Sequence, residues 1–410
     1  MDQNIKKNRT VEATFTILKE DGTPLANQEV TIEQTNHAFL FGTAAFDLVP
    51  LASGDYAGEE KEQAEGRAGR ITGLFNAATL PFYWARFEPQ RGQPMTEKVK
   101  NAAHWCLEHN LVTKGHPLCW HTLTADWLLT MSNAEILQAQ IARIQRDVSD
   151  FRGLIDMWDV INEAVIMPVF DKYDNGITRL CRELGRIKTI KTMFETARKT
   201  NPNAILLIND FDVSSAYDIL VEGCLEAGIQ FDAIGIQSHM HQGWWGVEKT
   251  LKVLENFERF HLPIHFTETT LLSGHLMPPE IVDLNDYQVT DWPTTLAGEE
   301  RQARETIQHY KTLFAHPLVE GITWWDSSDG GWLNAPAGLI RKDGSIKPAY
   351  EELNKLIKGE WWVPPTQMVT NEQGQIQLDC FFGEYKLTYG TQQETFRVTK
   401  EELPVIQVKV

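Results

Sequence analysis

The stretch that decides how the rest of the chain is interpreted is Leu154-Ile155-Asp156-Met157-Trp158-Asp159-Val160-Ile161-Asn162-Glu163-Ala164. An apolar run of strand character ends here in an amide and a carboxylate. A strand that is buried on both faces carries such groups at its end only when something uses them. A second apolar run, Leu262-Pro263-Ile264-His265-Phe266-Thr267-Glu268, ends in a carboxylate in the same way. Two strand-end carboxylates predict acid and base chemistry at one site.

Working outward, short apolar strands alternate with amphipathic helical stretches from about residue 39 onward, which is the pattern of βα units around a parallel sheet. The predicted strands are His37–Gly42, Asn76–Leu80, Val112–His116, Ile155–Val160, Ala204–Ile208, Ala233–Gln237, Ile264–Thr267 and Gly321–Trp325. The predicted helices include Thr96–His109, Asn133–Ser149, Arg179–Thr200 and Glu299–Ala315. Eight strands over about 320 residues predict an α/β fold, a (β/α)8 TIM barrel with long loops. A doubly wound open sheet is the alternative, but no glycine-rich phosphate-binding sequence follows the first strand.

Both ends of the chain have a different, alternating pattern. Val11–Gln34 predicts a β-hairpin with a turn at Glu20-Asp21-Gly22-Thr23-Pro24, and residues 360–410 contain further alternating runs. Neither segment has enough strands to be stable alone, so we expect them to form one accessory β-sandwich. The predicted domains are therefore the N-terminal β segment 1–36, the catalytic barrel 37–358 and the C-terminal β segment 359–410. The sandwich either binds glycan or braces the barrel, and bracing is the favoured interpretation.

Composition limits the possible partners. The 410 residues carry a net charge of −18, which argues against nucleic acid or an anionic membrane as a partner and favours a soluble protein. The five cysteines contain no Cys-x-x-Cys pair, so we expect free, mostly buried thiols. Met1–Thr10 lacks the apolar region of a signal peptide. We expect a monomer that is either cytoplasmic, or secreted or periplasmic if a signal peptide was removed.

Polar and aromatic side chains follow the predicted strands, where the active site of such a barrel lies. The candidate substrate-binding residues are His116, Trp120, His121, Asn162, Asn209, Gln237, His239, Tyr83, Trp84, Trp324, Trp325 and Trp332. For any one tryptophan, packing in the core is at least as good an interpretation as stacking on a sugar ring. Three of the histidines also permit a metal site, but their spacing lacks a compact motif such as His-Glu-x-x-His, so we expect no metal and no cofactor.

Hydrolysis of a glycosidic bond needs one carboxylic acid to protonate the leaving oxygen and one carboxylate to attack the anomeric carbon or activate water. Glu163 and Glu268 suit these two roles. His239 is placed to orient the nucleophilic carboxylate and keep it ionised, which leaves Glu163 as the acid. A non-catalytic carbohydrate-binding protein that has kept the barrel is the alternative from another class, and a metal-dependent hydrolase is a further one.

At these positions the chain resembles glycoside hydrolase family 10, the β-1,4-xylanase family of retaining enzymes on (β/α)8 barrels. The resemblance covers roughly residues 39–357. The segments that carry it are Trp158-Asp159-Val160-Ile161-Asn162-Glu163-Ala164, Gly115-His116-Pro117-Leu118-Cys119-Trp120-His121, Ile234-Gly235-Ile236-Gln237-Ser238-His239, Phe266-Thr267-Glu268 and Lys347-Pro348-Ala349-Tyr350. The resemblance implies that Glu163 is the acid/base and Glu268 the nucleophile, acting on xylan or a related polysaccharide or oligosaccharide.

The chain also departs from this family. Where the family has Glu-Asn-x-Met-Lys-Trp, this chain has Thr79-Leu80-Pro81-Phe82-Tyr83-Trp84, which lacks three hydrogen-bonding groups. Thr270 replaces the family's aspartate two residues after the nucleophile, and Thr269–Leu296 is a long loop expected to overhang the site. We therefore expect a glycone site altered for a decorated xylan or another β-linked glycan.

Overall fold

The barrel strands form a closed cylinder in a computed structural model that describes residues 1–400 and 406–407. Neighbouring strands are all parallel and follow the order β10-β3-β4-β5-β6-β7-β8-β9. The strand bounds are β3 Leu40–Ala44, β4 Ala77–Pro81, β5 Val112–His116, β6 Met157–Asn162, β7 Ile205–Asp210, β8 Ala233–Met240, β9 Ile264–Leu271 and β10 Val319–Trp324. The predicted TIM barrel is confirmed, with strand bounds that differ by a few residues from those expected.

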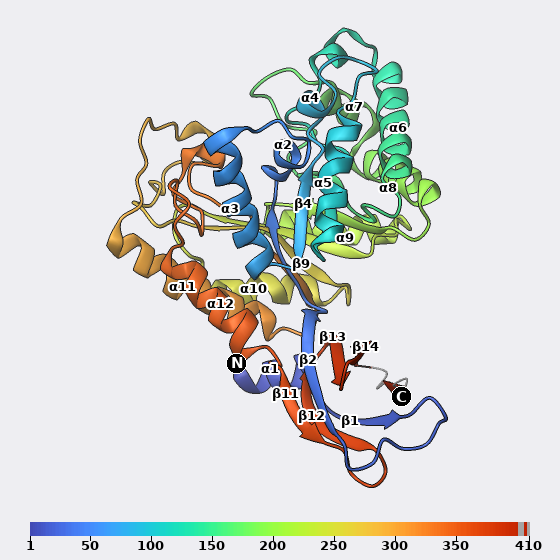
Figure 1. Cartoon of the computed structure of the whole chain (residues 1–410). Coiled ribbons are helices and arrows are strands. Elements are labelled where there is room, and N and C mark those ends of the chain that lie inside the picture. The colour runs from blue at the N-terminus through green and yellow to red at the C-terminus, as the bar shows by residue number, and fades with distance from the viewer. Residues whose placement is uncertain (401–405, 408–410) are drawn as a thin grey trace.

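Helices surround the cylinder on its outer side (Figure 1). Their bounds are α2 Leu48–Ala52, α3 Gly58–Leu74, α4 Trp84–Phe87, α5 Thr96–Glu108, α6 Asn133–Asp150, α7 Gly176–Leu184, α8 Arg186–Thr200, α9 Ser215–Glu226, α10 Gly246–Glu258, α11 Leu296–Phe314 and α12 Pro348–Lys355, with a π-helical turn at Leu356–Glu360. The single helix predicted over Arg179–Thr200 is wrong, because the backbone turns at Gly185 with φ +81°, a left-handed conformation that separates α7 from α8.

The strand interiors are apolar, and one close approach requires glycine. Trp158 on β6 is fully buried, and a Cβ atom at Gly115 on β5 would lie 2.2 Å from its indole ring. No side chain larger than hydrogen fits there. β6 is therefore packed closely against β5 at Trp158, just before the polar residues at the carboxyl end of β6.

The terminal segments form two sheets packed face to face (Figure 1), and their strands pair antiparallel except for β15, which pairs parallel with β1. One contains β12 Gln375–Phe381, β1 Thr10–Leu18 and β15 Ile406–Gln407; the other contains β11 Thr366–Val369, β2 Glu29–His37, β13 Gly383–Tyr389 and β14 Gln392–Val398. β1 pairs with β12, and β2 pairs with β11 and β13. The hairpin predicted for Val11–Gln34 is therefore wrong. Phe15 on β1 and Ile32 on β2 face a shared core from opposite sheets. The alternation of apolar and polar residues in a strand shows which face is buried, but it does not show which strand is its partner.

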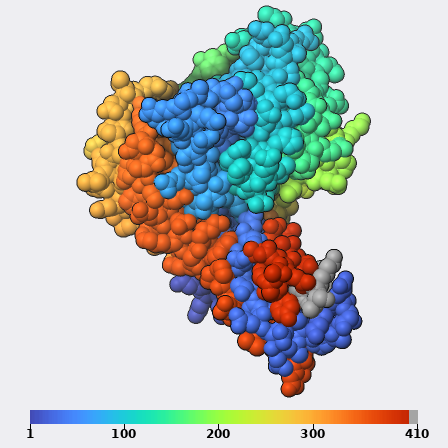
Figure 2. All heavy atoms as spheres, in the orientation of Figure 1, coloured from blue at the N-terminus to red at the C-terminus, as the bar shows by residue number. Residues whose placement is uncertain are grey.

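The sandwich is joined to the barrel by α1, Asp2–Arg9, and by aromatic contacts (Figure 1). The Arg9 guanidinium donates to the backbone oxygens of Phe314, His316 and Val319 at 2.7, 2.5 and 2.6 Å. The Trp361 ring stacks on Phe314 with centroids 4.2 Å apart. Figure 2 shows the result as a larger lobe, the barrel, and a smaller lobe below it.

Three further findings concern the described part of the chain. None of its helices has the length and apolar character needed to cross a membrane. Nowhere in residues 1–400 do three or more His, Cys, Asp or Glu side chains gather in a group able to hold a metal ion. The five cysteines are free and buried, as predicted.

Candidate active site

Glu163 and Glu268 lie at the carboxyl ends of their strands. Glu163 is the first residue after β6, and Glu268 lies within β9, which continues to Leu271. The backbone of Glu163 has φ +56°, and its backbone N–H donates to the backbone oxygen of Asn209 at 2.8 Å. A left-handed backbone is costly for a residue with a side chain, by about 1–3 kcal/mol, and persists where the surroundings hold it. β6 therefore ends in a strained residue that is tied to β7.

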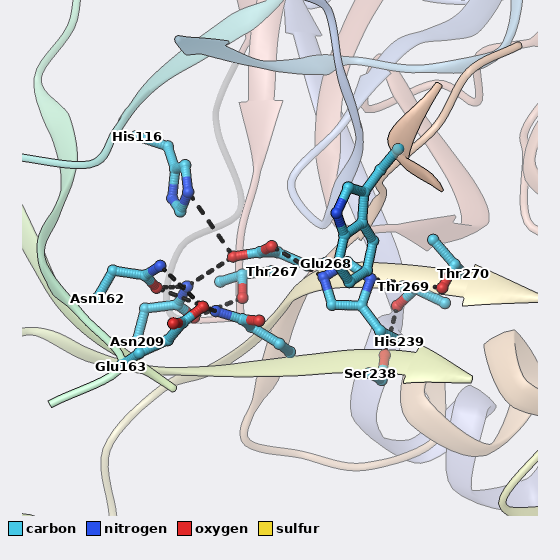
Figure 3. Close-up of polar contacts among 12 residues, drawn as sticks. His116, Asn162, Glu163, Asn209, Ser238, His239, Thr267, Glu268, Thr269 and Thr270 are labelled. Atoms are coloured by element: carbon cyan, nitrogen blue, oxygen red, sulfur yellow. Dashed lines mark hydrogen bonds and ion pairs between the residues drawn. The ribbon is translucent and has the colours of Figure 1, made fainter. Parts of the chain in front are cut away.

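Side-chain amides connect the two carboxylates (Figure 3). The Asn162 and Gln237 amide nitrogens each donate to Glu163 Oε1 at 3.3 Å. Asn209 Nδ2 donates to Asn162 Oδ1 at 2.8 Å and to Glu268 Oε1 at 2.9 Å. The chain of contacts therefore runs from Glu163 through Asn162 and Asn209 to Glu268, and it joins the ends of β6, β7 and β9, which lie far apart in the sequence.

A glycine makes room for the middle of this chain. A Cβ atom at Gly235 on β8 would lie 2.4 Å from Asn209 Oδ1. Thr267 Oγ1 donates to the same oxygen at 2.5 Å, so the amide is held with its nitrogen toward the carboxylates. Asn209 is thus a fixed donor between the two carboxyl groups.

Burial governs the protonation of Glu163. Trp120 Nε1 donates to Glu163 Oε2 at 2.8 Å, and His121 Nε2 lies 4.0 Å from the same oxygen. Burial, with smaller contributions from the charges of Asp210 and Glu268, raises the pKa of Glu163 to about 8, against the opposing hydrogen bond from Trp120. At neutral pH this carboxyl group therefore holds a proton that it can donate.

The pKa of Glu268 is shifted in the opposite direction from that of Glu163. Burial alone would raise the pKa of Glu268, but the nearby His116 and His239 outweigh it and the pKa is lowered. His239 Nε2 lies 3.0 Å from Oε2, and His116 Nε2 lies 3.9 Å from Oε1. His116 is itself held by a contact of 2.7 Å between its Nδ1 and Asp159. Glu268 is therefore kept ionised beside a group that is kept protonated.

The Nδ1 atom of His239, on the side of the ring away from Glu268, contacts the hydroxyl group of Thr270, the residue that stands where the family has an aspartate. Thr270 Oγ1 lies 3.4 Å from His239 Nδ1 and 3.3 Å from His241 Nδ1. Because ionised Glu268 can only accept, Nε2 of His239 carries the proton that faces it, and Nδ1 faces the Thr270 hydroxyl. Burial lowers the pKa of His241 to about 3, which keeps this ring neutral. Glu268 and Thr270 therefore hold the His239 ring from its two sides.

Aromatic side chains line one side of the site. Tyr83 and Trp325 belong to a small apolar cluster with Phe46 and Trp120 packed against it, and the Tyr83 ring lies 5.6 Å from Trp120. Trp332 lies 4.6 Å from the His239 ring. These rings present flat apolar faces beside the carboxylates.

Two predicted tryptophans are placed elsewhere. Trp324 has no exposed surface, and its Nε1 donates to the Ala337 oxygen. Trp84 is 3% exposed, donates to Glu88 and packs under the Arg143 guanidinium. Their predicted role in binding substrate is wrong, because each ring belongs to the barrel core. A strand-end position does not fix which way a large side chain turns.

Two acidic residues near the site were left out of the predicted set. Burial raises the pKa of Asp210, the last residue of β7, and of Asp326, after β10, to about 7 in each case. Asp210 accepts from the Val165 backbone N–H at 3.0 Å, and Asp326 from that of Trp332 at 3.2 Å. Both end apolar strands in the sequence, which is the signal that singled out Glu163.

Comparisons with known proteins agree with this geometry. Residues 74–356 match the model of Glycosyl hydrolase family 10. The chain is 26% identical over 302 residues to an endo-1,4-beta-xylanase/feruloyl esterase of Xylanibacter ruminicola, covering 67% of this chain and 40% of that protein. It is 25% identical over 362 residues to endo-1,4-beta-xylanase C of Paenibacillus barcinonensis, covering 78% of this chain and 32% of that protein. The chain thus spans less than half the length of either relative.

Solved structures show the same fold. The crystal structure of xylanase 10B from Thermotoga petrophila in complex with xylobiose matches with a TM-score of 0.63 and 20% identity, covering 79% of this chain and 95% of that one. A thermostable mutant of a xylanase from Cellvibrio japonicus gives a TM-score of 0.63 and 23% identity, covering 78% and 98%. Because the family model spans most of the barrel, including both strand-end glutamates, the chain belongs to glycosyl hydrolase family 10.

Proposed function

We propose that this chain is a retaining glycoside hydrolase, endo-1,4-β-xylanase-like, that cleaves β-1,4-linked glycan, xylan or a decorated xylan, by double displacement. The observation that carries the proposal is the pair of buried carboxyl groups joined by Asn162 and Asn209, of which one has its pKa raised and the other lowered. When the pKa values of two neighbouring carboxyl groups are shifted in opposite directions, the group with the raised pKa serves as the acid and the other as the nucleophile.

In the first step Glu268 attacks the anomeric carbon while Glu163 gives its proton to the leaving oxygen. The contacts of Glu268 with His239 and His116 keep the attacking carboxylate ionised. The Asn209 amide, 2.9 Å from Glu268 Oε1, holds the carboxylate in place for attack. The bond to the leaving oxygen breaks as the bond to Glu268 forms.

In the second step Glu163, now ionised, takes a proton from a water molecule, which attacks the anomeric carbon and releases Glu268. Loss of its proton to the substrate leaves Glu163 charged in a buried site, where Trp120 Nε1 at 2.8 Å stabilises the negative form. Two displacements retain the configuration of the anomeric carbon. This scheme predicts that the two carboxyl groups lie ~5–5.5 Å apart.

The substrate class is proposed from the relatives and from the aromatic side of the site. The relatives named above are endo-1,4-β-xylanases, and one solved neighbour contains xylobiose. Thr79 and Leu80, two of the three positions that depart from the family, are buried in the barrel, so only Tyr83 of the three meets the aromatic cluster. An apolar ring where the family has a charged donor favours a substituted sugar over a bare xylosyl unit. Equal or higher activity on plain linear xylo-oligosaccharides would contradict this preference.

The decisive experiment compares the wild type with Glu163→Gln on an aryl β-xyloside that has a good leaving group. Such a leaving group needs no acid, so the variant should form the glycosyl–Glu268 ester and hydrolyse it slowly. Intact-protein mass spectrometry should then show a gain of one xylosyl unit, located on Glu268 by peptide mapping. NMR of the wild-type reaction should show the β-anomer as the first product; the α-anomer first would refute double displacement.

Two other functions give different outcomes. A carbohydrate-binding protein without catalysis would bind xylo-oligosaccharide and release no reducing sugar, in the wild type as in Glu268→Gln. A metal-dependent hydrolase would lose activity with a chelator, whereas the proposed mechanism needs no cofactor and is unaffected. For the sandwich we propose a bracing role, which is supported by the packing of Trp361 on Phe314 and of the Trp362 ring against His37.

A further inference from the structure

The segment 272–295, between β9 and α11, has a small core of its own. Leu272, Met277 and Trp292 are buried against Ala335 and Ala337 from the loop after β10. A long loop that packs around its own apolar side chains holds a defined shape. The short 3-10 turn Leu284–Asp286 is therefore carried on a formed support.

Polar contacts fix the base of this segment to the residues that follow β8. The Met277 N–H donates to the His241 oxygen at 2.9 Å, and Gln242 Nε2 donates to the oxygens of Pro278 and Ile281 at 2.9 and 2.7 Å. The segment thus leaves β9, crosses the end of β8 and continues toward the loop that follows β6.

Two contacts hold the tip of the segment on opposite sides of the site. Lys172, in the loop after β6, lies 2.7 Å from Asp283 and 2.6 Å from Asp286. On the other side Trp332 Nε1, in the loop after β10, donates to Asn285 Oδ1 at 3.2 Å. We call these contacts of Lys172 and Trp332 with residues 283–286 the clip.

Side-chain contacts connect the clip to both Glu163 and Glu268. On one side the Phe170 ring, two residues before Lys172, packs against His121 with centroids 4.6 Å apart, and His121 lies 4.0 Å from Glu163. On the other side Trp332 packs on His239, which contacts Glu268.

The contacts therefore close into a ring. Its lower half is the amide chain from Glu163 through Asn162 and Asn209 to Glu268 (Figure 3), and its upper half is the clip. A glycan that is cleaved by double displacement passes between the two carboxylates. A chain that continues toward residues 283–286 then has to pass through this ring of contacts.

We propose that the clip selects substrates by length: short oligosaccharides enter the ring by their ends, whereas the interior of a polymer is admitted only after Lys172 has left Asp283 and Asp286. This proposal rests on the proposed function. Exposed ion pairs are weak, so opening is accessible on the catalytic time scale and sets a modest barrier for long substrates.

The test measures kcat/KM on polymeric xylan relative to kcat/KM on xylotriose, because the ratio cancels general losses of activity. In Lys172→Glu the clip is replaced by repulsion, and the ratio should rise by about three- to tenfold, the range expected when two weak ion pairs are lost. Adding Asp283→Lys and Asp286→Lys to this variant reverses the charges and should return the ratio to the wild-type value. Lys252→Glu, which breaks an exposed pair on α10 away from the site, should leave the ratio unchanged.

A ratio that is the same in Lys172→Glu and wild type would overturn the proposal, and so would a ratio that stays raised in the charge-reversed variant. If the wild type hydrolyses neither substrate, the proposed function fails instead. The clip itself is then judged by hydrogen exchange of the backbone amides in residues 283–287: faster exchange in Lys172→Glu that is restored by the reversal supports it, and unchanged exchange overturns it.

Discussion

Replacing Glu163 by glutamine should stabilise the folded protein at neutral and alkaline pH, and increasingly so as the pH rises. The pKa of Glu163 is raised from 4.5 to about 8 by burial, so the folded state holds this proton more tightly than the unfolded chain does. The wild type therefore loses stability as the pH rises from about 4.5 to about 8. Glutamine does not ionise, so Glu163→Gln is free of this loss.

The magnitude follows from the two pKa values. At 1.36 kcal/mol per pH unit, the difference between 4.5 and about 8 amounts to about 5 kcal/mol. The side chain is 13% exposed, and this contact with water reduces the penalty, so we expect about 3–5 kcal/mol. Glutamine can accept from Asn162 and Gln237 but then turns its own N–H groups toward Trp120. That mismatch costs about 1 kcal/mol at every pH and does not change the slope.

The assay is the difference in apparent Tm between Glu163→Gln and wild type at pH 4.5, 6, 7.5 and 9. At about 2.1 cal/mol/K per residue, 3–5 kcal/mol in a chain of 410 residues corresponds to about 4–6 °C between the ends of this range. The other titrating groups are common to both proteins and largely cancel. Glu255→Gln is the matched control, because that carboxylate is exposed and its difference should be flat. A difference for Glu163→Gln that is equally flat would refute a buried, proton-holding Glu163.

Three further predictions follow from single contacts. Trp120→Phe removes the donor to Glu163, so the alkaline limb of the kcat/KM pH profile should move up by about one pH unit, with the acid limb unmoved. Thr270→Val removes the hydroxyl group that contacts His239 Nδ1, so this ring loses its support on the side away from Glu268; kcat should fall about tenfold, and the ¹⁵N chemical shifts of the ring nitrogens should change. Phe15→Ala leaves a cavity in the sandwich core and should cost about 3–5 kcal/mol in a denaturant titration, while kcat on xylotriose stays within a factor of two.

The barrel was predictable because its signals are local. A strand such as β7 begins as a short apolar run, Ile205-Leu206-Leu207-Ile208, between helical stretches, and a closed parallel barrel brings all strand ends to one face whatever their order along the chain. Glu163 and Glu268 could therefore be paired from the sequence alone. The pairing of β1 and β2 was not predictable in the same way, because alternation in both strands fits a hairpin as well as two facing sheets.

The sequence by itself determined the fold class, the family and the set of polar groups that meet at the strand ends, since these depend on residue type and on spacing along the chain. Only the tertiary structure decided which rings face the site, why one carboxyl group keeps its proton and the other does not, and that Lys172 reaches across to Asp283 and Asp286. Those properties come from burial and from contacts between residues far apart in sequence. Desolvation and short-range electrostatics depend on distance in space, which a local pattern does not contain.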